Sequence, residues 1–287
     1  MNRTQEAAAK HLKLSGYTVI EAVDSNDVIA ECDNCGRHYQ RNLTNLSRVV
    51  ARNHTFGCVR CFYENVASAR RKHLTLSNGD RLRFRTLIDG LLLGDAHISR
   101  DGQLVIGQAV DKKGWIDQIG FTLADLDVEF TVKSHRSLQK SYFVTRDRVY
   151  KCKPIIRLST SVYQEIVDER RRWYPKGKKR IPEDVDLSAK SVAHWFAGDG
   201  CGDINGRLKF CTQGFPRRDV NMLQSRFRDS DIHTNIADSR GPELHIMRLN
   251  DAYRVAQAIR PHLPYCMLYK LRYTRPSTHH LALGKTS

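Results

Sequence analysis

The chain has 287 residues, of which 40% are hydrophobic, and this is enough for two or three folding units with buried cores. Lys and Arg total 47 against 31 Asp and Glu, a net charge of +16 that favours nucleic acid as a partner over a membrane surface or a merely well-solvated basic surface. No apolar run approaches the ~18 residues of a membrane span, and residues 1–16 lack the apolar core of a signal peptide. We therefore expect a protein without a membrane segment in a reducing, intracellular compartment, either a bacterial or phage-infected cytoplasm or an organelle.

The N-terminal region, residues 1–75, contains two closely spaced cysteine pairs. Cys32 and Cys35 form one C-x2-C motif, Cys58 and Cys61 form another, and 22 residues separate them. Two such pairs in a reducing compartment are typical of a tetrahedral structural Zn²⁺ site, with a redox dithiol as the alternative. The segment between them is rich in Arg, Asn and hydroxyl side chains that can contact phosphates and base edges. The sequence predicts a zinc-binding module that assists DNA binding, against the alternative of a purely structural unit.

Two histidines, His38 and His54, can replace a cysteine as a zinc ligand. The other cysteines, Cys152, Cys201, Cys211 and Cys266, show no ligand spacing, and we predict that they are buried thiols.

A polar, basic stretch at residues 69–85 predicts a domain boundary, after which the chain is approximately duplicated. The apolar helix LIDGLLLGDA returns about a hundred residues later as SVAHWFAGDG. We expect one half at residues 76–182, including a linker, and a second half at residues 183–287. Seven Lys or Arg from Arg170 to Arg180 make the linker basic, and Pro175, Gly177 and Pro182 interrupt any helix there.

Alternating apolar and polar residues predict the strands of each half, and longer amphipathic stretches predict its helices. In the first half we expect strands at residues 97–100, 103–109, 133–145 and 153–159, with helices at residues 113–126 and 162–173. In the second half we expect strands at residues 207–212, 233–238 and 243–249, with helices at residues 217–227 and 251–259. The predicted fold class is α+β, with the order αββαββα occurring twice.

Each of the two repeated helices has small residues at positions i and i+4 and then ends in Gly-Asp. The small residues are Gly90 and Gly94 in the first helix and Ala193 and Ala197 in the second. Two such faces let helices approach backbone to backbone, which would bring Asp95 and Asp199 together. Paired carboxylates repel unless a divalent cation lies between them, so the sequence predicts a Mg²⁺ site suited to phosphodiester hydrolysis. The alternative is that each Gly-Asp merely ends a helix.

The segments GLLLGDAHI and AHWFAGDG resemble the two signature helices of LAGLIDADG homing endonucleases, and the resemblance extends from about Leu87 to Tyr273. The text GKKRIPEDVDLSAKSVAHWFAGDG is similar to the monomeric members that carry both motifs in one chain. The resemblance implies a pseudo-twofold core with two saddle-shaped antiparallel sheets. It also implies a monomer that binds double-stranded DNA in the major groove and makes a metal-dependent double-strand break with short 3′ overhangs.

The same resemblance assigns roles to individual residues. It implies that Asp95 and Asp199 are catalytic carboxylates that bind Mg²⁺, assisted by the backbone at Gly94 and Gly198. It places basic catalytic residues at Lys179 and Lys270, for which a solvated surface charge is the alternative. It places Gln108 and Gln213, and with them Lys112, where polar side chains organise water in the active site, with ordinary strand polarity as the alternative.

The sequence departs from the family pattern at Ala96, where a glycine is usual, and at His194, where a small residue is usual. We expect His194 to pack against Gly90 and His97 to be an ordinary strand residue. Two other functions remain open. An RNA maturase that assists intron splicing would use the same basic saddle and would bind RNA, and a DNA-binding regulator can be built on an inactive nuclease fold. Retention of both aspartates and both lysines argues against the regulator.

Overall fold

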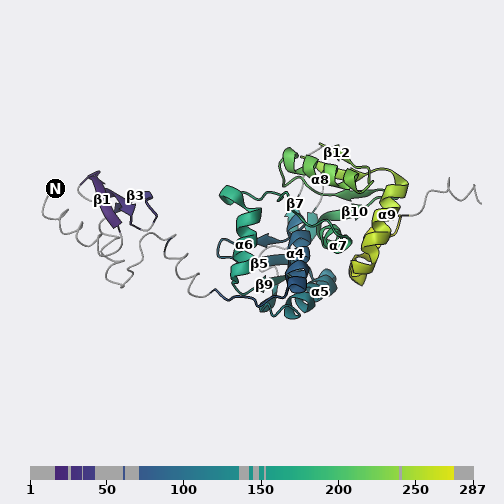
Figure 1. The fold of residues 1–287 in the computed structure, drawn as a ribbon, viewed down its shortest axis with the longest axis horizontal. Coiled ribbons are helices and arrows are strands. Elements are labelled where there is room, and N and C mark those ends of the chain that lie inside the picture. The colour runs from purple at the N-terminus through teal and green to yellow at the C-terminus, as the bar shows by residue number, and fades with distance from the viewer. Residues whose placement is uncertain are drawn as a thin grey trace, which may run out of the picture. The chain divides into compact units, whose positions relative to one another are not determined.

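The protein is described by a computed structural model that covers residues 17–24, 27–33, 35–42, 61, 71–135, 142–144, 149–151, 153–238 and 241–274. The chain forms two compact units, Met1–Arg71 and Lys72–Ser287 (Figure 1). Within the described part of the chain, none of the helices has the length and hydrophobicity needed to cross a bilayer.

The first unit contains a three-stranded antiparallel sheet in the order β1-β2-β3. Its strands are β1 (Tyr17–Ala22), β2 (Asp27–Cys32) and β3 (His38–Asn42). The side chains of β2 alternate, and Val28, Ala30 and Cys32 point into a small core that also contains Tyr17 and Cys61. Among the described residues this core is small, so binding of a metal there would add substantially to stability.

The second unit repeats one arrangement of helices and strands. The first copy contains α4 (Asn78–Leu93), β4 (His97–Ile98), β5 (Leu104–Ala109), η1 (Val110–Lys112), α5 (Lys113–Ala124), β6 (Phe130–His135), β7 (Tyr142–Val144), β8 (Val149–Lys151), β9 (Ile155–Thr160), α6 (Gln164–Trp173) and η2 (Pro175–Gly177). The second copy contains α7 (Ala189–Asp199), β10 (Gly200–Gly202), β11 (Leu208–Phe210), α8 (Arg217–Asp229), β12 (Asn235–Ala237), β13 (Glu243–Ile246), α9 (Leu249–Ile259), η3 (Arg260–His262) and η4 (Tyr265–Leu271). The predicted αββαββα order, and with it the α+β class, is confirmed.

Each copy builds one four-stranded antiparallel sheet, and the two sheets have equivalent strand orders. These orders are β4-β5-β9-β6 and β10-β11-β13-β12. In the first copy, the single strand predicted over residues 133–145 is wrong. The strand β6 begins earlier, at Phe130, and β7 is a separate strand that forms its own two-stranded sheet with β8. The alternating pattern identified strand-forming residues but did not predict that β6 ends at His135. His135 forms the last residue pair of β6 with β9, opposite Ile155.

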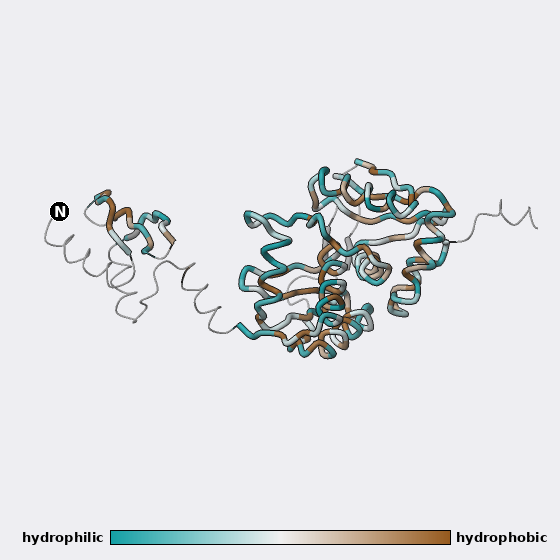
Figure 2. The backbone as a smooth tube through the Cα atoms, in the orientation of Figure 1, coloured by the Kyte–Doolittle hydropathy of each residue, from teal (hydrophilic) through white to brown (hydrophobic). Residues whose placement is uncertain are grey.

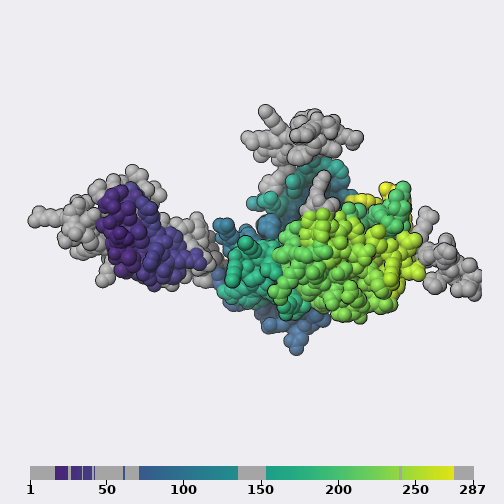
Figure 3. All heavy atoms as spheres, turned by 90° about the horizontal axis from the view of Figure 1, so that it is seen from above, coloured from purple at the N-terminus to yellow at the C-terminus, as the bar shows by residue number. Residues whose placement is uncertain are grey.

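The two Gly-Asp helices, α4 and α7, lie side by side at the centre of the second unit (Figure 1). Ser77 and Ser188 cap their N-termini by accepting hydrogen bonds from Asp80 N and Ser191 N. Apolar residues concentrate along these helices and in the neighbouring strands, which together form the main buried cluster (Figure 2). In the space-filling view the second copy, coloured green to yellow, is one continuous body (Figure 3).

The contact between α4 and α7 is backbone to backbone, because glycine leaves no side chain between them. A Cβ atom on Gly90 would lie only 2.3 Å from Ser191 O and 2.8 Å from His194 Cβ. The predicted packing of His194 against Gly90 is therefore confirmed. A Cβ atom on Gly94 would lie 3.5 Å from Gly198 Cα, so the close approach continues to the ends of both helices.

A fully buried carboxylate, Asp89, joins α4 to the end of α6 and to the segment that follows it. Arg172 donates to both of its oxygens, at 2.7 and 2.8 Å, and Trp173 Nε1 donates at 3.0 Å. The backbone N–H of Asp186 donates at 2.8 Å. A buried carboxylate is tolerated when each lone pair is used in this way. Asp89 therefore fixes the chain that leads into α7.

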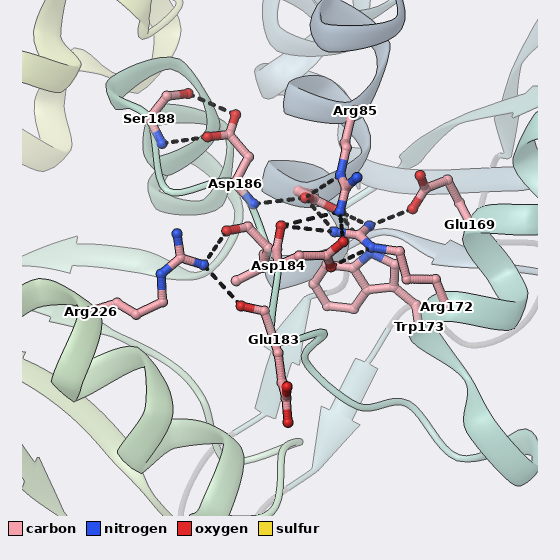
Figure 4. A network of polar contacts seen from close by, with 11 residues as sticks. Arg85, Glu169, Arg172, Trp173, Glu183, Asp184, Asp186, Ser188 and Arg226 are labelled. Atoms are coloured by element: carbon pink, nitrogen blue, oxygen red, sulfur yellow. Dashed lines mark hydrogen bonds and ion pairs between the residues drawn. The ribbon is translucent and has the colours of Figure 1, made fainter.

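The segment before α7 is also bonded to the second copy. Arg180 donates to both carboxylate oxygens of Asp219 in α8, at 2.7 and 2.8 Å, and Ile181 N donates at 3.0 Å. Arg226, also in α8, donates to the carbonyl oxygens of Glu183 and Val185 (Figure 4). The segment is basic in sequence, as predicted, but part of its charge is used to hold the two copies together.

We predict that Gly90→Ala destabilises the second unit by about 2–4 kcal/mol, because the new methyl group has no space between the helices. The matched control is Gly79→Ala in the same helix, where the nearest atom to the new Cβ is Ser77 Oγ at 3.8 Å. That change should stabilise the protein by up to ~1 kcal/mol, the usual gain on replacing a helical glycine. Chemical denaturation of both variants measures the difference. Equal stabilities would contradict the close packing.

Candidate active site

The active-site candidates Asp95 and Asp199 meet where α4 and α7 end. Gly94 is the C-cap of α4, and Asp199 is the last residue of α7. The carboxylate of Asp95 lies against the partner helix, since a Cβ atom on Gly198 would be 3.4 Å from Asp95 Oδ2 and 3.0 Å from Asp95 N. The structure thus brings the two aspartates together, as the sequence predicts.

The local electrostatics are those of two crowded carboxylates. Burial, and then the charge of Asp95, raise the pKa of Asp199 to about 6, although Lys179 and Lys270 act in the opposite direction. Asp95 itself is exposed, so its charge is partly solvated. A divalent cation between the two side chains would relieve the repulsion that raises the pKa of Asp199.

Lys179 and Lys270 lie near this carboxylate pair, each at the end of one helix. Lys179 Nζ donates to Ala96 O at 3.0 Å, just past the end of α4. Lys270 Nζ donates to the carbonyl oxygens of Phe196, Ala197 and Gly198 at 3.1, 2.8 and 2.9 Å. Helix C-termini attract cations, because their last carbonyl groups lack intrahelical partners. Each lysine is therefore held at the end of the Gly-Asp helix of its own copy, Lys179 by one carbonyl group and Lys270 by three.

Burial lowers the pKa of both ammonium groups. For Lys179 the pKa falls to about 8, and for Lys270 it is also lowered, while the charges of Asp95 and Asp199 oppose the change in each case. With a pKa of about 8, Lys179 stays mostly protonated at neutral pH. Both ammonium groups are held in place by backbone carbonyl oxygens. They are suited to stabilise negative charge that develops beside the aspartates.

The three predicted polar assistants differ in their placement. Gln108 Nε2 donates to Asp95 Oδ2, so this residue lies in the site. Gln213 instead donates to Glu243, and Lys112 Nζ lies 4.2 Å above the ring of Tyr269, the neighbour of Lys270. Among the described residues, neither Gln213 nor Lys112 has a hydrogen bond or ion pair with the two aspartates. Within the described part of the chain, Asp95 accepts a hydrogen bond from a glutamine amide and Asp199 does not, so the two halves of the site are unequal.

The oxygen donors at the helix ends fit a hard divalent cation such as Mg²⁺. Two carboxylates from different helices provide anionic oxygens, and the carbonyl groups of Gly94 and Gly198 lie at the same ends. The Gly198 carbonyl already accepts a hydrogen bond from Lys270, which leaves it one further lone pair.

The outward faces of the two sheets carry the polar residues that the alternating strands predict. In the first sheet, Lys133, Arg157 and Gly107 lie in one row across three strands. In the second sheet, Lys209 and His245 occupy one row with Cys201 and Asn235. Burial and the charges of Lys179, Arg157 and Arg170 lower the pKa of His97, which lies on β4 as predicted. A face with such positive charge attracts anions.

In the first unit, three of the four predicted zinc ligands converge. The sulfur atoms of Cys32, Cys35 and Cys61 all lie within 4.8 Å of one another, and the sulfurs of Cys32 and Cys61 are 3.8 Å apart. Thiolates bound tetrahedrally to one zinc ion would be ~3.8 Å apart. Gly36, with φ of +64°, lets the chain turn back after Cys35. Cys58 and His54 lie outside the described residues, and His38 forms an ion pair with Glu31.

Sequence reasoning misjudged one cysteine and missed two carboxylates. Cys201, predicted to be buried, is exposed, because it lies on the outward face of the second sheet, whereas Cys211 and Cys266 are half-buried and Cys152 lies outside the described residues. Asp89 and Glu243 were not identified as organising residues. A carboxylate within an apolar helix was a usable signal for Asp89, but nothing local marks Glu243.

Comparisons with known proteins agree with this geometry. The model of the LAGLIDADG DNA endonuclease family matches residues 85–252, more than half of the chain. An uncharacterized protein of Methanocaldococcus jannaschii is 31% identical over 183 residues, which are 58% of this chain and 68% of that protein. Cytochrome b mRNA maturase bI2 of Debaryomyces hansenii is 30% identical over 129 residues, which are 42% of this chain and 48% of the maturase.

Among solved structures, the homing endonuclease I-WcaI bound to its DNA recognition sequence is similar in fold. The TM-score is 0.55 at 18% sequence identity, over 74% of this chain and 92% of the other. The predicted LAGLIDADG-type core is confirmed by the family match together with this likeness in fold.

We predict that Asp199→Asn stabilises the metal-free protein at pH 7.5 but not near pH 4. The pKa of Asp199 is about 6 in the folded protein and about 3.9 in an unfolded chain. Below about pH 4 the carboxyl is neutral in both states, so it has no effect. Between about pH 4 and 6 the carboxyl group ionises in the unfolded chain before it ionises in the folded protein, so the wild type loses stability relative to the variant. Above about pH 6 the difference in unfolding free energy between the two proteins stays constant.

Melting temperatures in a chelator at the two pH values measure this effect. We expect a gain of about 2 °C or more at pH 7.5, or ~1 kcal/mol with solvent screening included. The control is Asp101→Asn in an exposed turn, which should change neither value. A gain that is the same at both pH values would contradict the crowding of the two carboxylates.

Proposed function

The chain belongs to the LAGLIDADG DNA endonuclease family, and we propose that it is a site-specific homing endonuclease. In this proposal it acts as a monomer that makes a metal-dependent double-strand break with short 3′ overhangs in a long, pseudo-palindromic DNA target. The observation that carries the proposal is the meeting of Asp95 and Asp199 between two lysines held at equivalent helix ends.

Each group at the helix ends has a role in the proposed cleavage of a phosphodiester. Asp95 and Asp199, with backbone oxygens at Gly94 and Gly198, would hold Mg²⁺. The bound metal would supply an activated water and stabilise the attacking and leaving oxygens. Gln108 orients the carboxylate of Asp95 through its hydrogen bond. Lys179 and Lys270 stabilise the charge that develops on the two scissile phosphates, one in each strand.

The surface around the site supports DNA as the substrate. Two sheets of equivalent strand order present polar outward faces, and the chain as a whole carries a net charge of +16. A two-stranded or sheet surface of this kind fits the major groove, where side chains read base edges. The homing endonuclease I-WcaI, which is similar in fold, binds a DNA recognition sequence, and this supports the same role for this chain.

We assign the first unit a supporting role. The sulfurs of Cys32, Cys35 and Cys61, together with Cys58, would bind one structural Zn²⁺. Zinc would then stabilise a module whose small core is marginal without it. The basic residues of this unit would add phosphate contacts and so increase affinity rather than rate.

A second candidate function is that of an RNA maturase, which the 30% identity to a cytochrome b mRNA maturase favours. The two functions differ in what they require of the aspartates. Cutting DNA needs both Asp95 and Asp199, whereas binding and folding an intron needs only the basic surface. The variants below therefore separate the two, as does a comparison of affinities for duplex DNA and for structured RNA.

We predict that Asp95→Asn or Asp199→Asn lowers the rate of double-strand cleavage by about a thousandfold or more, while DNA affinity changes little. The loss falls on metal binding and not on the sheets. Cleavage selection of purified protein on a randomised duplex library with Mg²⁺ first yields the target. Rates and affinities are then measured on that duplex.

The control for these variants is Asp101→Asn, which should leave the cleavage rate unchanged. A single aspartate variant that still cuts both strands at the wild-type rate would overturn the paired catalytic site. If no DNA target is cut by the wild type, but structured RNA is bound tightly, the maturase role would replace the nuclease role.

We also predict that the double change Cys32→Ser, Cys35→Ser removes one equivalent of zinc and unfolds the first unit, without loss of cleavage chemistry. DNA binding should weaken, and its dependence on salt should become less steep by about one unit of slope for each lost phosphate contact. Elemental analysis and binding at several salt concentrations measure both effects. The control is Cys266→Ser, a change in the second unit that should leave the zinc content unaltered. An unchanged zinc content in the Cys32→Ser, Cys35→Ser variant would refute the metal site.

A further inference from the structure

The outward face of the second sheet carries a compact polar cluster that the proposed chemistry does not use. It consists of Lys209, Gln213, Glu243 and His245, and we call it the Glu243 cluster. Gln213 Nε2 donates to Glu243 Oε1, and His245 Nε2 lies 3.0 Å from Glu243 Oε2. Lys209 Nζ lies 3.6 Å from the same oxygen. One carboxylate therefore joins three donors from separate segments of the chain.

The members of the cluster differ in how far they are exposed. The side chain of Glu243 is only 12% exposed, whereas those of Lys209 and His245 are 41% and 22% exposed. The next residues along these strands, Phe210 and Leu244, are fully buried on the opposite face of the sheet. The cluster thus points outward, with Glu243 beneath and its three partners above it.

Glu243 remains charged in this position. The hydrogen bond from His245, together with the charge of Lys209, lowers the pKa of Glu243 against the effect of burial. An ionised carboxylate is only an acceptor, so each partner must present a donor to it. This requirement fixes the orientation of the Gln213 amide, with Nε2 toward Glu243 and Oε1 away from it.

An amide held in this way has one acceptor and one remaining N–H available. That pair matches adenine in the major groove, which offers the N6 amino group as a donor and N7 as an acceptor. Nε2 of His245 faces Glu243, and among the described residues its Nδ1 has no hydrogen-bond partner. Lys209 retains further N–H groups. The Glu243 cluster therefore presents a defined pattern of donors and acceptors.

The equivalent place in the first sheet is built differently. Leu158 pairs with Ile106 in one copy, and Leu244 pairs with Phe210 in the other, so the residue before each leucine, Arg157 or Glu243, occupies the same position. Arg157 is exposed, and within the described part of the chain its side chain has no hydrogen bond or ion pair. The two copies thus carry opposite charges at one equivalent position.

We infer that Glu243 is a positioning residue for target recognition, which orients Gln213, Lys209 and His245 to read the base pairs of the second half-site. In this arrangement Gln213 selects an adenine, and Glu243 makes no contact with DNA of its own. The inference rests on the proposed function, because it assumes that the sheets bind duplex DNA. It assigns Gln213 to recognition in place of catalysis.

Binding selection from a randomised DNA duplex library, with zinc-loaded full-length protein and no added Mg²⁺ so that cleavage does not occur, tests this role. Gln213→Ala, Lys209→Ala and His245→Ala identify the base pairs that each residue reads, and Arg157→Gln marks the first half-site. In Glu243→Gln an amide replaces the carboxylate, and its N–H groups face the N–H donors of Gln213, Lys209 and His245, so these side chains lose their fixed orientation. We expect base preference to fall about tenfold at the pairs marked by the three single variants, with no change in the first half-site.

Each other result overturns the role. Unchanged base preferences in Glu243→Gln would show that Gln213, Lys209 and His245 do not need Glu243 to recognise bases. A changed preference at a base pair that none of the three single variants affects would show that Glu243 contacts a base itself. An equal loss in both half-sites, with a lowered melting temperature, would show a purely structural role. A wild-type protein that enriches no DNA sequence would overturn the proposed function first, which distinguishes the two failures.

Discussion

The backbone contact between α4 and α7 is the constraint on which the rest of the structure depends. Gly90 has no room for a side chain against Ser191, and the approach stays close as far as Gly94 and Gly198. Only this closeness brings two carboxylates from distant parts of the chain into one electrostatic field. The elevated pKa of Asp199 is therefore a direct consequence of helix packing, and so is the suitability of the site for a divalent cation.

The duplication sets equivalent positions but does not make the two halves chemically equal. Both lysines are held by carbonyl oxygens at helix ends, so this feature occurs in both copies. Gln108 reaches Asp95, while Gln213 is bound to Glu243 instead. A single chain can change each half independently, which a pair of identical subunits cannot do. The structure shows this divergence both at the aspartates and on the outward faces of the sheets.

Sequence reasoning succeeded where the chemistry is local or repeated. The two Gly-Asp helices, their small residues and the strands that follow could be predicted, because periodicity and spacing are visible in the chain. The end of β6 at His135, the exposure of Cys201 and the partners of Asp89 and Glu243 could not, since these depend on contacts between distant segments. Strand alternation placed Glu243 on a sheet without showing which side chains would surround it.

The interlaced hydrogen bonds of the segment before α7 restrict how such proteins can be recombined. Residues Arg180 and Ile181 are bonded to α8, yet Asp186, further along the chain, is bonded to Asp89 in α4. A hybrid made by joining halves of two relatives at any point between these residues keeps the expected sequence order but separates bonded partners. Arg226, which donates a hydrogen bond to the carbonyl oxygen of Val185, would lose this acceptor as well. A hybrid that combines the halves of two relatives would therefore need residues 180–186, together with Asp89 and Asp219, to come from the same parent.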